Sequence, residues 1–250
     1  QIAFSFGPDK QDQWRQRAFL CFDKFVDVRL KSDQEISLLA REMEIDIAID
    51  LKGYTRNCRP NIFAEGCAPI QVSYLGYPGT MAANYMDYLI ADHTLIPEEK
   101  KHHYLEKIVY MPNSYQVNVS NRNISKTLLL RHKFGLPSKG FVFCCFNNTY
   151  KITPSTFIGW MRILKAVEDS VLWLFENNGN TTKNLKKEAM KFGINEDRLV
   201  FATHMPVEEH LNRIKQADLF IDTLPYNAHT TASDALRMGL PVLTCVGNSF

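Results

Sequence analysis

The sequence of 250 residues lacks the short signatures of several common enzyme classes. It has no G-x-G-x-x-G and no Walker A motif, which disfavours a dinucleotide dehydrogenase and a P-loop nucleotidase. It has no G-x-S-x-G nucleophile elbow. Asp-x-Asp, the metal–diphosphate signature expected of a metal-dependent sugar transferase, is also absent. If a diphosphate leaves in this protein, a helix N-terminus and a lysine would have to offset its charge.

The cysteines, charges and apolar runs exclude further classes. None of the six cysteines forms a C-x-x-C pair, so we expect no zinc site, and their place in apolar runs favours a reducing cytoplasm. No run approaches the roughly 18 apolar residues that span a bilayer. The net charge of +2 points neither to nucleic acid nor to a membrane as a partner. The start lacks both a signal-peptide pattern and Met, so we expect either a fragment or a sequence numbered from its first ordered residue.

Apolar and amphipathic runs alternate along the chain and predict its fold. We expect strands at Ile2–Phe6, Val26–Leu30, Ile45–Asp50, Ile70–Leu75, Tyr88–Ala91, Lys107–Met111, Phe141–Phe146, Val171–Phe175, Leu199–Ala202, Leu219–Asp222 and Pro241–Cys245. We expect helices near Gln11–Phe22, Asp33–Met43, Pro97–Tyr104, Pro154–Val167, Thr182–Phe192, Pro206–Gln216 and Thr230–Met238. Strands that are apolar on both faces and separated by helices predict a doubly wound α/β fold with parallel sheets.

One polar stretch interrupts this alternation and predicts a boundary between two lobes. We place an N-terminal lobe at residues 1–113, a linker at 114–139 and a C-terminal lobe at 140–250. The linker is rich in Asn, Ser and Arg and ends in Gly135-Leu136-Pro137-Ser138.

Ligands of open parallel sheets bind beyond the carboxyl ends of the strands, so the loops there hold the candidate site. Lys151 follows the strand Phe141–Phe146 and precedes a helix capped by Thr153, where it either reaches an anion or is an ordinary surface lysine. His229, Thr230 and Thr231 precede or open another helix, and such a start binds anions.

Three more features are candidates on weaker grounds. Asp234, one turn into that helix, either accepts from ribose hydroxyls or forms a capping pair with Thr231. His210 lies one turn into a helix, where it is either structural or stacks on a base. The loop Leu75-Gly76-Tyr77-Pro78 is tight enough for its backbone to approach a ligand, or it is a plain turn.

These loops resemble those of glycosyltransferase family 41, which includes the O-linked N-acetylglucosaminyltransferase and SPINDLY. The similar text is LKGYTRNCRPNIFAEGCAPIQVSYLGYPGT, MDYLIAD, FCCFNNTYKITPS, SVLWLFE and LFIDTLPYNAHTTASDALRMGLPVLT, and it covers nearly the whole chain. It is closest to bacterial members, which follow tetratricopeptide repeats. The resemblance implies the GT-B fold, two Rossmann-like lobes with parallel sheets facing a cleft. It also implies transfer of a sugar with inversion and without a metal or cofactor.

The resemblance also implies roles for the candidate residues. Lys151 and the run His229-Thr230-Thr231 correspond to the donor-diphosphate site, and Asp234 to the ribose-binding Asp. The remaining donor-side positions are Asn148 in place of a glutamine, Met205 and His210 beside the uracil, and Leu75, Gly76 and Pro78 beside the sugar.

The sequence departs from the family pattern at Val207, which replaces a nucleobase-side lysine. It also lacks the His-Pro segment that opens the first lobe, the closing helices and the repeats.

We therefore expect transfer of N-acetylglucosamine from UDP-GlcNAc, a nucleotide sugar, to a Ser or Thr hydroxyl of a protein. A GDP-fucose-dependent O-fucosyltransferase is the alternative, because the SPINDLY branch shares these motifs. A nucleotide-sugar epimerase uses GT-B-like lobes too. A fragment that binds nucleotide without turnover is the non-enzymatic alternative.

Overall fold

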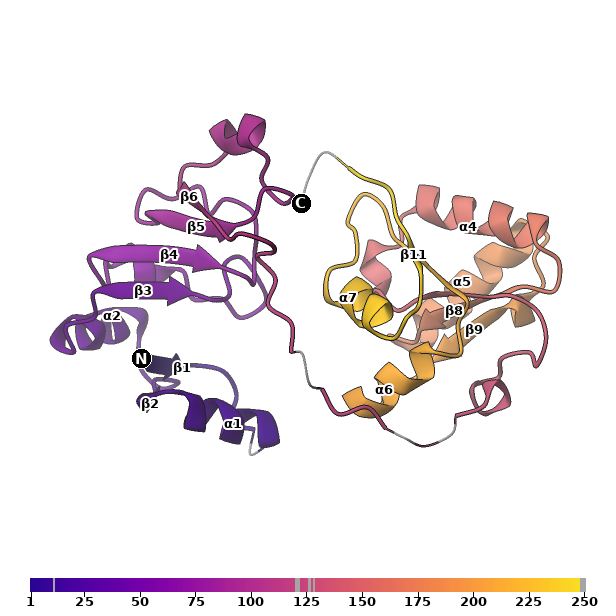
Figure 1. The fold of residues 1–250 in the computed structure, drawn as a ribbon, viewed down its shortest axis with the longest axis horizontal. Helices are drawn as coiled ribbons and strands as arrows, with labels where there is room; N and C mark the ends of the chain where they lie inside the picture. The colour runs from indigo at the N-terminus through magenta and orange to yellow at the C-terminus, as the bar shows by residue number, and fades with distance from the viewer. Residues whose placement is uncertain (11, 120–121, 126, 128, 248–250) are drawn as a thin grey trace. The chain divides into compact units, whose positions relative to one another are not determined.

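A computed structural model describes residues 1–10, 12–119, 122–125, 127 and 129–247. The chain divides into two compact units, Gln1–Val117 and Asn118–Phe250, which are described separately below (Figure 1). The polar segment at 114–139 is thereby shared between the two units. Within the described part of the chain, no helix has the length and apolar character needed to cross a membrane.

Unit 1 begins with a small parallel sheet. Strands β1 (Ile2–Ser5) and β2 (Lys24–Asp27) pair in parallel and are joined through helix α1 (Gln13–Cys21). The predicted strand Val26–Leu30 was wrong at both ends. Arg29 turns back to bind the Asp27 carboxylate through its backbone and side chain, and Leu30 is fully exposed. The chain therefore leaves the sheet after Asp27.

The larger sheet of unit 1 has four parallel strands. They are β3 (Ile47–Asp50), β4 (Ile70–Tyr74), β5 (Tyr88–Ala91) and β6 (Lys107–Tyr110), paired in sequence order. Figure 1 shows β3, β4 and β5 side by side with their arrows in one direction. Helices α2 (Asp33–Glu42) and α3 (Asn61–Ala64) lie in the connections, and α2 starts with the capping box Ser32/Glu35.

Unit 2 contains a five-stranded parallel sheet. Its strands are β7 (Val142–Cys145), β8 (Val171–Phe175), β9 (Leu199–Ala202), β10 (Leu219–Ile221) and β11 (Val242–Leu243), in the spatial order β11-β10-β7-β8-β9. The first strand is central, two strands follow on one side, and the last two lie on the other. This is the Rossmann order 3-2-1-4-5, which switches direction between β7 and β10. The predicted α/β class with parallel sheets is confirmed.

Four α-helices connect the strands of unit 2. They are α4 (Pro154–Ala166), α5 (Gly179–Lys191), α6 (Val207–Ile214) and α7 (Thr230–Arg237). The strands β7 and β8 are buried along nearly their whole length, with Trp173 and Leu172 fully enclosed. This continuous burial explains why apolar residues alone revealed these strands.

Several predicted elements differ from the observed bounds by one or two residues at an end, and three further differences have a clear structural reason or change the element type. The predicted helix Pro97–Tyr104 is the 3₁₀ helix η1 (Glu98–His103). Helix α5 starts at Gly179 instead of Thr182, because the Asn178 side chain caps it by accepting from the Thr181 N–H at 2.9 Å. The predicted strand Pro241–Cys245 pairs with β10 only over Val242–Leu243, at the edge of the sheet.

Candidate functional site

The strand order of unit 2 brings two candidate loops together. Strands β7 and β10 are neighbours, with Phe143 opposite Leu219 and Cys144 opposite Phe220. The loop after β7 carries Asn147 to Lys151, and the loop after β10 leads to the start of α7. In doubly wound sheets the ligand-binding crevice lies beyond the carboxyl ends of two neighbouring strands whose connections leave in opposite directions, and β7 and β10 are such a pair.

A buried polar network joins the two loops under this crevice. The Asn147 side chain is only 2% exposed. Its amide Nδ2 donates to Asp222 Oδ1 at 3.0 Å and to Thr223 Oγ1 at 2.8 Å. Its Oδ1 accepts from the Thr231 hydroxyl in the first turn of α7. Asn147 therefore fixes the loop after β7 to both ends of the loop after β10.

Asp222 is the second centre of the network. Its Oδ1 also accepts from the backbone N–H groups of Thr223 and Ala228, both at 2.8 Å. Its Oδ2 accepts from the Asn227 side chain at 3.1 Å and from Thr244 Oγ1 at 2.7 Å. Five hydrogen bonds to one buried carboxylate hold the loop in a single shape.

Sequence reasoning did not select Asn147 or Asp222 as functional residues. A usable signal was present, because each is a polar residue at or directly after the end of an apolar strand.

Lys151 lies in the 3₁₀ helix η3 (Thr149–Lys151) and points at the opposite loop. Its Nζ donates to the Asn227 carbonyl at 2.9 Å and lies 3.8 Å from the centroid of the Tyr226 ring. Burial lowers the pKa of Lys151, while the Asp222 carboxylate acts in the opposite sense. The half-buried ammonium is therefore poorly hydrated, and this strengthens its attraction for an anion in the crevice.

His229, Thr230 and Thr231 lie at the start of α7, as predicted. His229 is the N-cap residue and its ring packs edge-on against Tyr226, with centroids 5.9 Å apart. Burial lowers the pKa of His229 and the charge of Lys151 lowers it further. Lys151 affects His229 because the two side chains are close in space, so the structure brings these predicted residues together. The N–H groups in the first turn of a helix have no acceptor within the helix, so the start of α7 can donate to an anion.

His210, on α6, is held by a residue that sequence reasoning missed. Its Nδ1 accepts from the Nε–H of Arg213 at 2.9 Å. The Arg213 side chain is buried, donates to the Thr203 carbonyl at 2.7 Å and lies 5.4 Å from the Phe146 ring centroid. Burial, Arg213 and His204 lower the pKa of His210 to about 4. His210 is therefore neutral at pH 7, and its proton is on Nε2, which becomes a donor.

The other predicted donor residues of unit 2 lie on the loops around these strand ends. Asn148 is exposed and is the N-cap residue of η3. Met205 is half-buried between β9 and α6. Asp234, one turn into α7, accepts from the guanidinium of Arg122 at 2.8 Å instead of forming the predicted capping pair with Thr231. The alternative that Asp234 only forms a capping pair with Thr231 was therefore wrong.

The predicted loop of unit 1 follows β4. Leu75 adopts a left-handed backbone with a φ of 70°. A Cβ on Gly76 would lie 2.3 Å from the Leu51 carbonyl oxygen, so only glycine fits there. Pro78 is buried. The loop is thus pressed against the loop after β3, which explains its glycine.

Among the residues that the structure describes, no group of three or more His, Cys, Asp or Glu side chains is placed to hold a metal ion. Two groups at the switch point of unit 2 can attract an anion: the Lys151 ammonium and the N-terminus of α7.

Fold and site together define a Rossmann-type α/β unit with a lysine and a helix N-terminus at the switch point of its parallel sheet. The sequence model of Glycosyl transferase family 41 matches residues 2–128 and 119–250. The chain belongs to this family.

Two solved or curated relatives show how far the similarity extends. The "Probable UDP-N-acetylglucosamine--peptide N-acetylglucosaminyltransferase SEC" of Arabidopsis thaliana is 36% identical over 248 residues, which is 97% of this chain and 25% of that protein. A mutant of the Thermobaculum terrenum O-GlcNAc transferase superposes with a TM-score of 0.87 at 29% identity, over 99% of this chain and 47% of that one. The structural match confirms the predicted GT-B fold class.

A third relative belongs to the SPINDLY group. It is the "Probable UDP-N-acetylglucosamine--peptide N-acetylglucosaminyltransferase SPINDLY" of Arabidopsis thaliana, 30% identical over 229 residues, or 86% of this chain and 24% of that protein. The chain thus spans about a quarter of the length of these curated relatives.

Proposed function

We propose that this chain is the catalytic region of a glycosyltransferase that moves N-acetylglucosamine from UDP-GlcNAc to a Ser or Thr hydroxyl of a protein. The observation that carries the proposal is the switch point of unit 2, where Lys151 and the start of α7 meet beyond β7 and β10. The names of the relatives, UDP-N-acetylglucosamine--peptide N-acetylglucosaminyltransferases, support the donor and the peptide acceptor.

The reaction is a single displacement with inversion. The acceptor oxygen attacks the anomeric carbon, the bond from that carbon to the diphosphate oxygen breaks, and the bonding electrons leave on UDP. The acceptor hydroxyl gives up its proton to a base. Negative charge develops on the diphosphate, so a donor that is already aimed at it lowers the barrier.

Lys151 and α7 are the groups that would stabilise this charge. The Lys151 ammonium donates to the Asn227 carbonyl and lies over the Tyr226 ring, and both partners are neutral. An arriving diphosphate offers a stronger, charged acceptor. The Thr231 hydroxyl already donates to Asn147, so we expect the N–H groups of this helical turn to make the phosphate contacts.

The nucleoside would lie beside α6 and α7. The Nε2–H of a neutral His210 is a donor at the nucleobase side, near Met205, and Asp234 is an acceptor for ribose hydroxyls. We propose that the enzyme needs no metal, because two positive groups face the diphosphate position. A cytoplasmic location would keep its six free thiols reduced.

The test is calorimetry with UDP and with GDP in a buffer that contains a chelator, on the wild type and on Lys151→Ala. Because loss of one charge-stabilising donor costs about 10²–10³ in rate, transfer to a peptide should fall by a similar factor in this variant. UDP affinity should fall as well. Lys165→Ala is the control, since it removes the same charge from an exposed position on α4.

Each result has a definite meaning. UDP binding that Lys151→Ala weakens and Lys165→Ala does not would support the donor site. A preference for GDP would support the fucosyl alternative. Near-wild-type transfer by Lys151→Ala would refute the assignment of the diphosphate site, and conversion of the donor without an acceptor would indicate an epimerase.

A further inference from the structure

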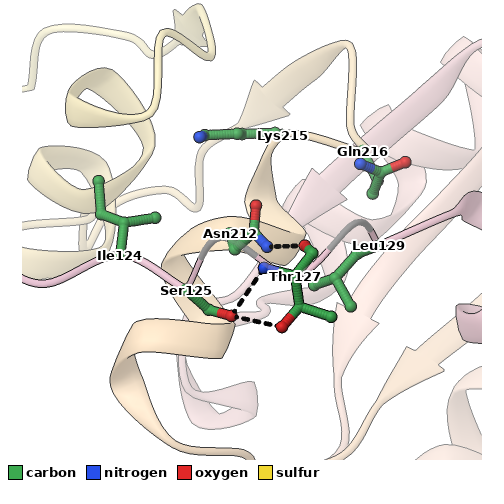
Figure 2. Close-up of a pocket in the computed structure, with 7 residues that line it drawn as sticks. All are labelled: Ile124, Ser125, Thr127, Leu129, Asn212, Lys215 and Gln216. Atoms are coloured by element: carbon green, nitrogen blue, oxygen red, sulfur yellow. Dashed lines mark hydrogen bonds between the residues drawn. The ribbon is translucent and has the colours of Figure 1, made fainter.

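The segment that joins the two units is attached to α6 in unit 2. The Ser125 N–H donates to the Glu208 carbonyl at 3.2 Å, and the Asn212 side chain donates to the Thr127 carbonyl at 2.7 Å. Figure 2 shows Asn212 and Ser125 directed at Thr127. These three residues help to line a hollow of about 580 Å³. The chain just before this attachment carries Arg122, whose position is therefore fixed from one side by unit 2.

Arg122 forms an ion pair with one of the candidate donor residues. Its Nη1 lies 2.8 Å from Asp234 Oδ1, although 112 residues separate the two in sequence. The side chains are 25% and 15% exposed, so this pair is partly shielded from water. Sequence reasoning treated Arg122 only as part of a polar linker.

Positive neighbours favour the ionised form of Asp234, in which both carboxylate oxygens are acceptors. Burial raises the pKa of Asp234, whereas Arg122, through its charge and its hydrogen bond, and Arg237, through its charge, lower it. The ion pair uses Oδ1 alone, and Oδ2 has no donor among the described residues. One oxygen is thus anchored and the other is available to a ligand.

We propose that Arg122 is a positioning residue of the nucleotide site: it holds the Asp234 carboxylate ionised and oriented so that Oδ2 accepts from the ribose hydroxyls of the nucleotide. The inference rests on the proposed function, in which α7 binds a nucleoside diphosphate. It adds the linker to the donor site, since Arg122 precedes the first strand of the unit-2 sheet.

Arg131 offers a matched comparison within the same segment. It too pairs with a unit-2 carboxylate, Asp218, at 2.8 Å, and it also donates to the carbonyl groups of Gly140 and Gln216. Asp218 accepts from the Val142 N–H at the start of β7, the opposite end of the strand from the site. Arg131 therefore docks the linker without reaching the nucleotide.

The experiment compares binding of UDP and of 2′,3′-dideoxy-UDP by calorimetry. The proteins are the wild type, Arg122→Gln, Arg122→Lys, Lys151→Ala and Arg131→Gln, with unfolding midpoints measured for each. We expect the wild type to prefer UDP by at least ~10-fold, because hydrogen bonds to a charged group are lost with the hydroxyls. Arg122→Gln should lose most of that preference by weakening UDP alone. Arg122→Lys should restore part of it, and Arg131→Gln should retain it.

Several outcomes would overturn the proposal. The proposal is refuted if Arg122→Gln leaves the affinity for UDP unchanged or increases it. It is also refuted if this variant weakens the binding of UDP and of 2′,3′-dideoxy-UDP equally. If Arg131→Gln loses the preference as well, linker docking and not Arg122 is responsible. In all these cases the proposed function is still supported if Lys151→Ala weakens UDP binding. A wild type that binds neither UDP nor GDP overturns both proposals together.

Discussion

Replacing Asn147 by alanine removes the link between the two loops of the crevice. The side chain makes three hydrogen bonds, to Asp222, Thr223 and Thr231, and is 2% exposed. The bond to the Asp222 carboxylate is of the charged kind, worth about 1.5–3 kcal/mol, and each neutral bond is worth about 1 kcal/mol. We therefore expect the free energy of unfolding of unit 2 to fall by about 3–5 kcal/mol.

The neighbouring asparagine is the control for this prediction. Asn148 is exposed, and no side-chain hydrogen bond caps the 3₁₀ helix that it precedes. Asn148→Ala should therefore change the free energy of unfolding by no more than about 0.5 kcal/mol. The two substituted positions are adjacent in the sequence, yet their expected losses of unfolding free energy differ by roughly 2.5 kcal/mol or more.

Urea denaturation followed by tryptophan fluorescence is the assay. Trp160 and Trp173 are buried in unit 2, whereas Trp14 of unit 1 is 49% exposed, so the largest signal should report unit 2. Equal midpoints and slopes for Asn147→Ala and Asn148→Ala would refute the reasoning, because a buried network that can be removed without cost does not fix the loops.

Two further predictions concern other parts of the molecule. Because the pKa of His210 is lowered to about 4, the unfolded chain binds more protons between that pH and about 6.5, so unfolding free energy should decrease as pH falls through this window. His210→Gln should flatten the pH dependence measured by urea denaturation, and the exposed His103→Gln should not. Gly76→Ala should destabilise unit 1 by more than about 2 kcal/mol in thermal unfolding, because its Cβ would meet the Leu51 carbonyl. Gly159→Ala, in helix α4 with open space around it, should stabilise unit 2 by about 0.5–1 kcal/mol, and the same sign for both glycines would contradict the geometry.

Much of the sheet of unit 2 could be predicted from the sequence. The predicted strands Val171–Phe175 and Leu199–Ala202 have the observed bounds, because each is apolar and flanked by polar residues. The start of α4 was also readable, since Thr153 and Pro154 form a local cap. These features depend on near neighbours, which a sequence displays directly.

What could not be predicted depends on residues far apart in the chain. Asn147 and Asp222 are 75 residues apart, and Arg122 and Asp234 are 112 apart. Nothing in the local sequence says that either pair meets. The strand β2 was misplaced for a similar reason, because its bounds follow from pairing with β1 and from the Arg29–Asp27 contact.

The strand order explains why the candidate residues come from two distant segments and still form one site. A Rossmann order places the first and fourth strands of unit 2 side by side, so the loops that follow them diverge around a common crevice. Loops that diverge keep a fixed distance only if a contact joins them, and the buried hydrogen bond from Asn147 to Asp222 is such a contact. If this hydrogen bond positions Lys151 relative to α7, Asn147→Ala must weaken UDP binding. It must do so even though Asn147 is too deeply buried to touch the nucleotide.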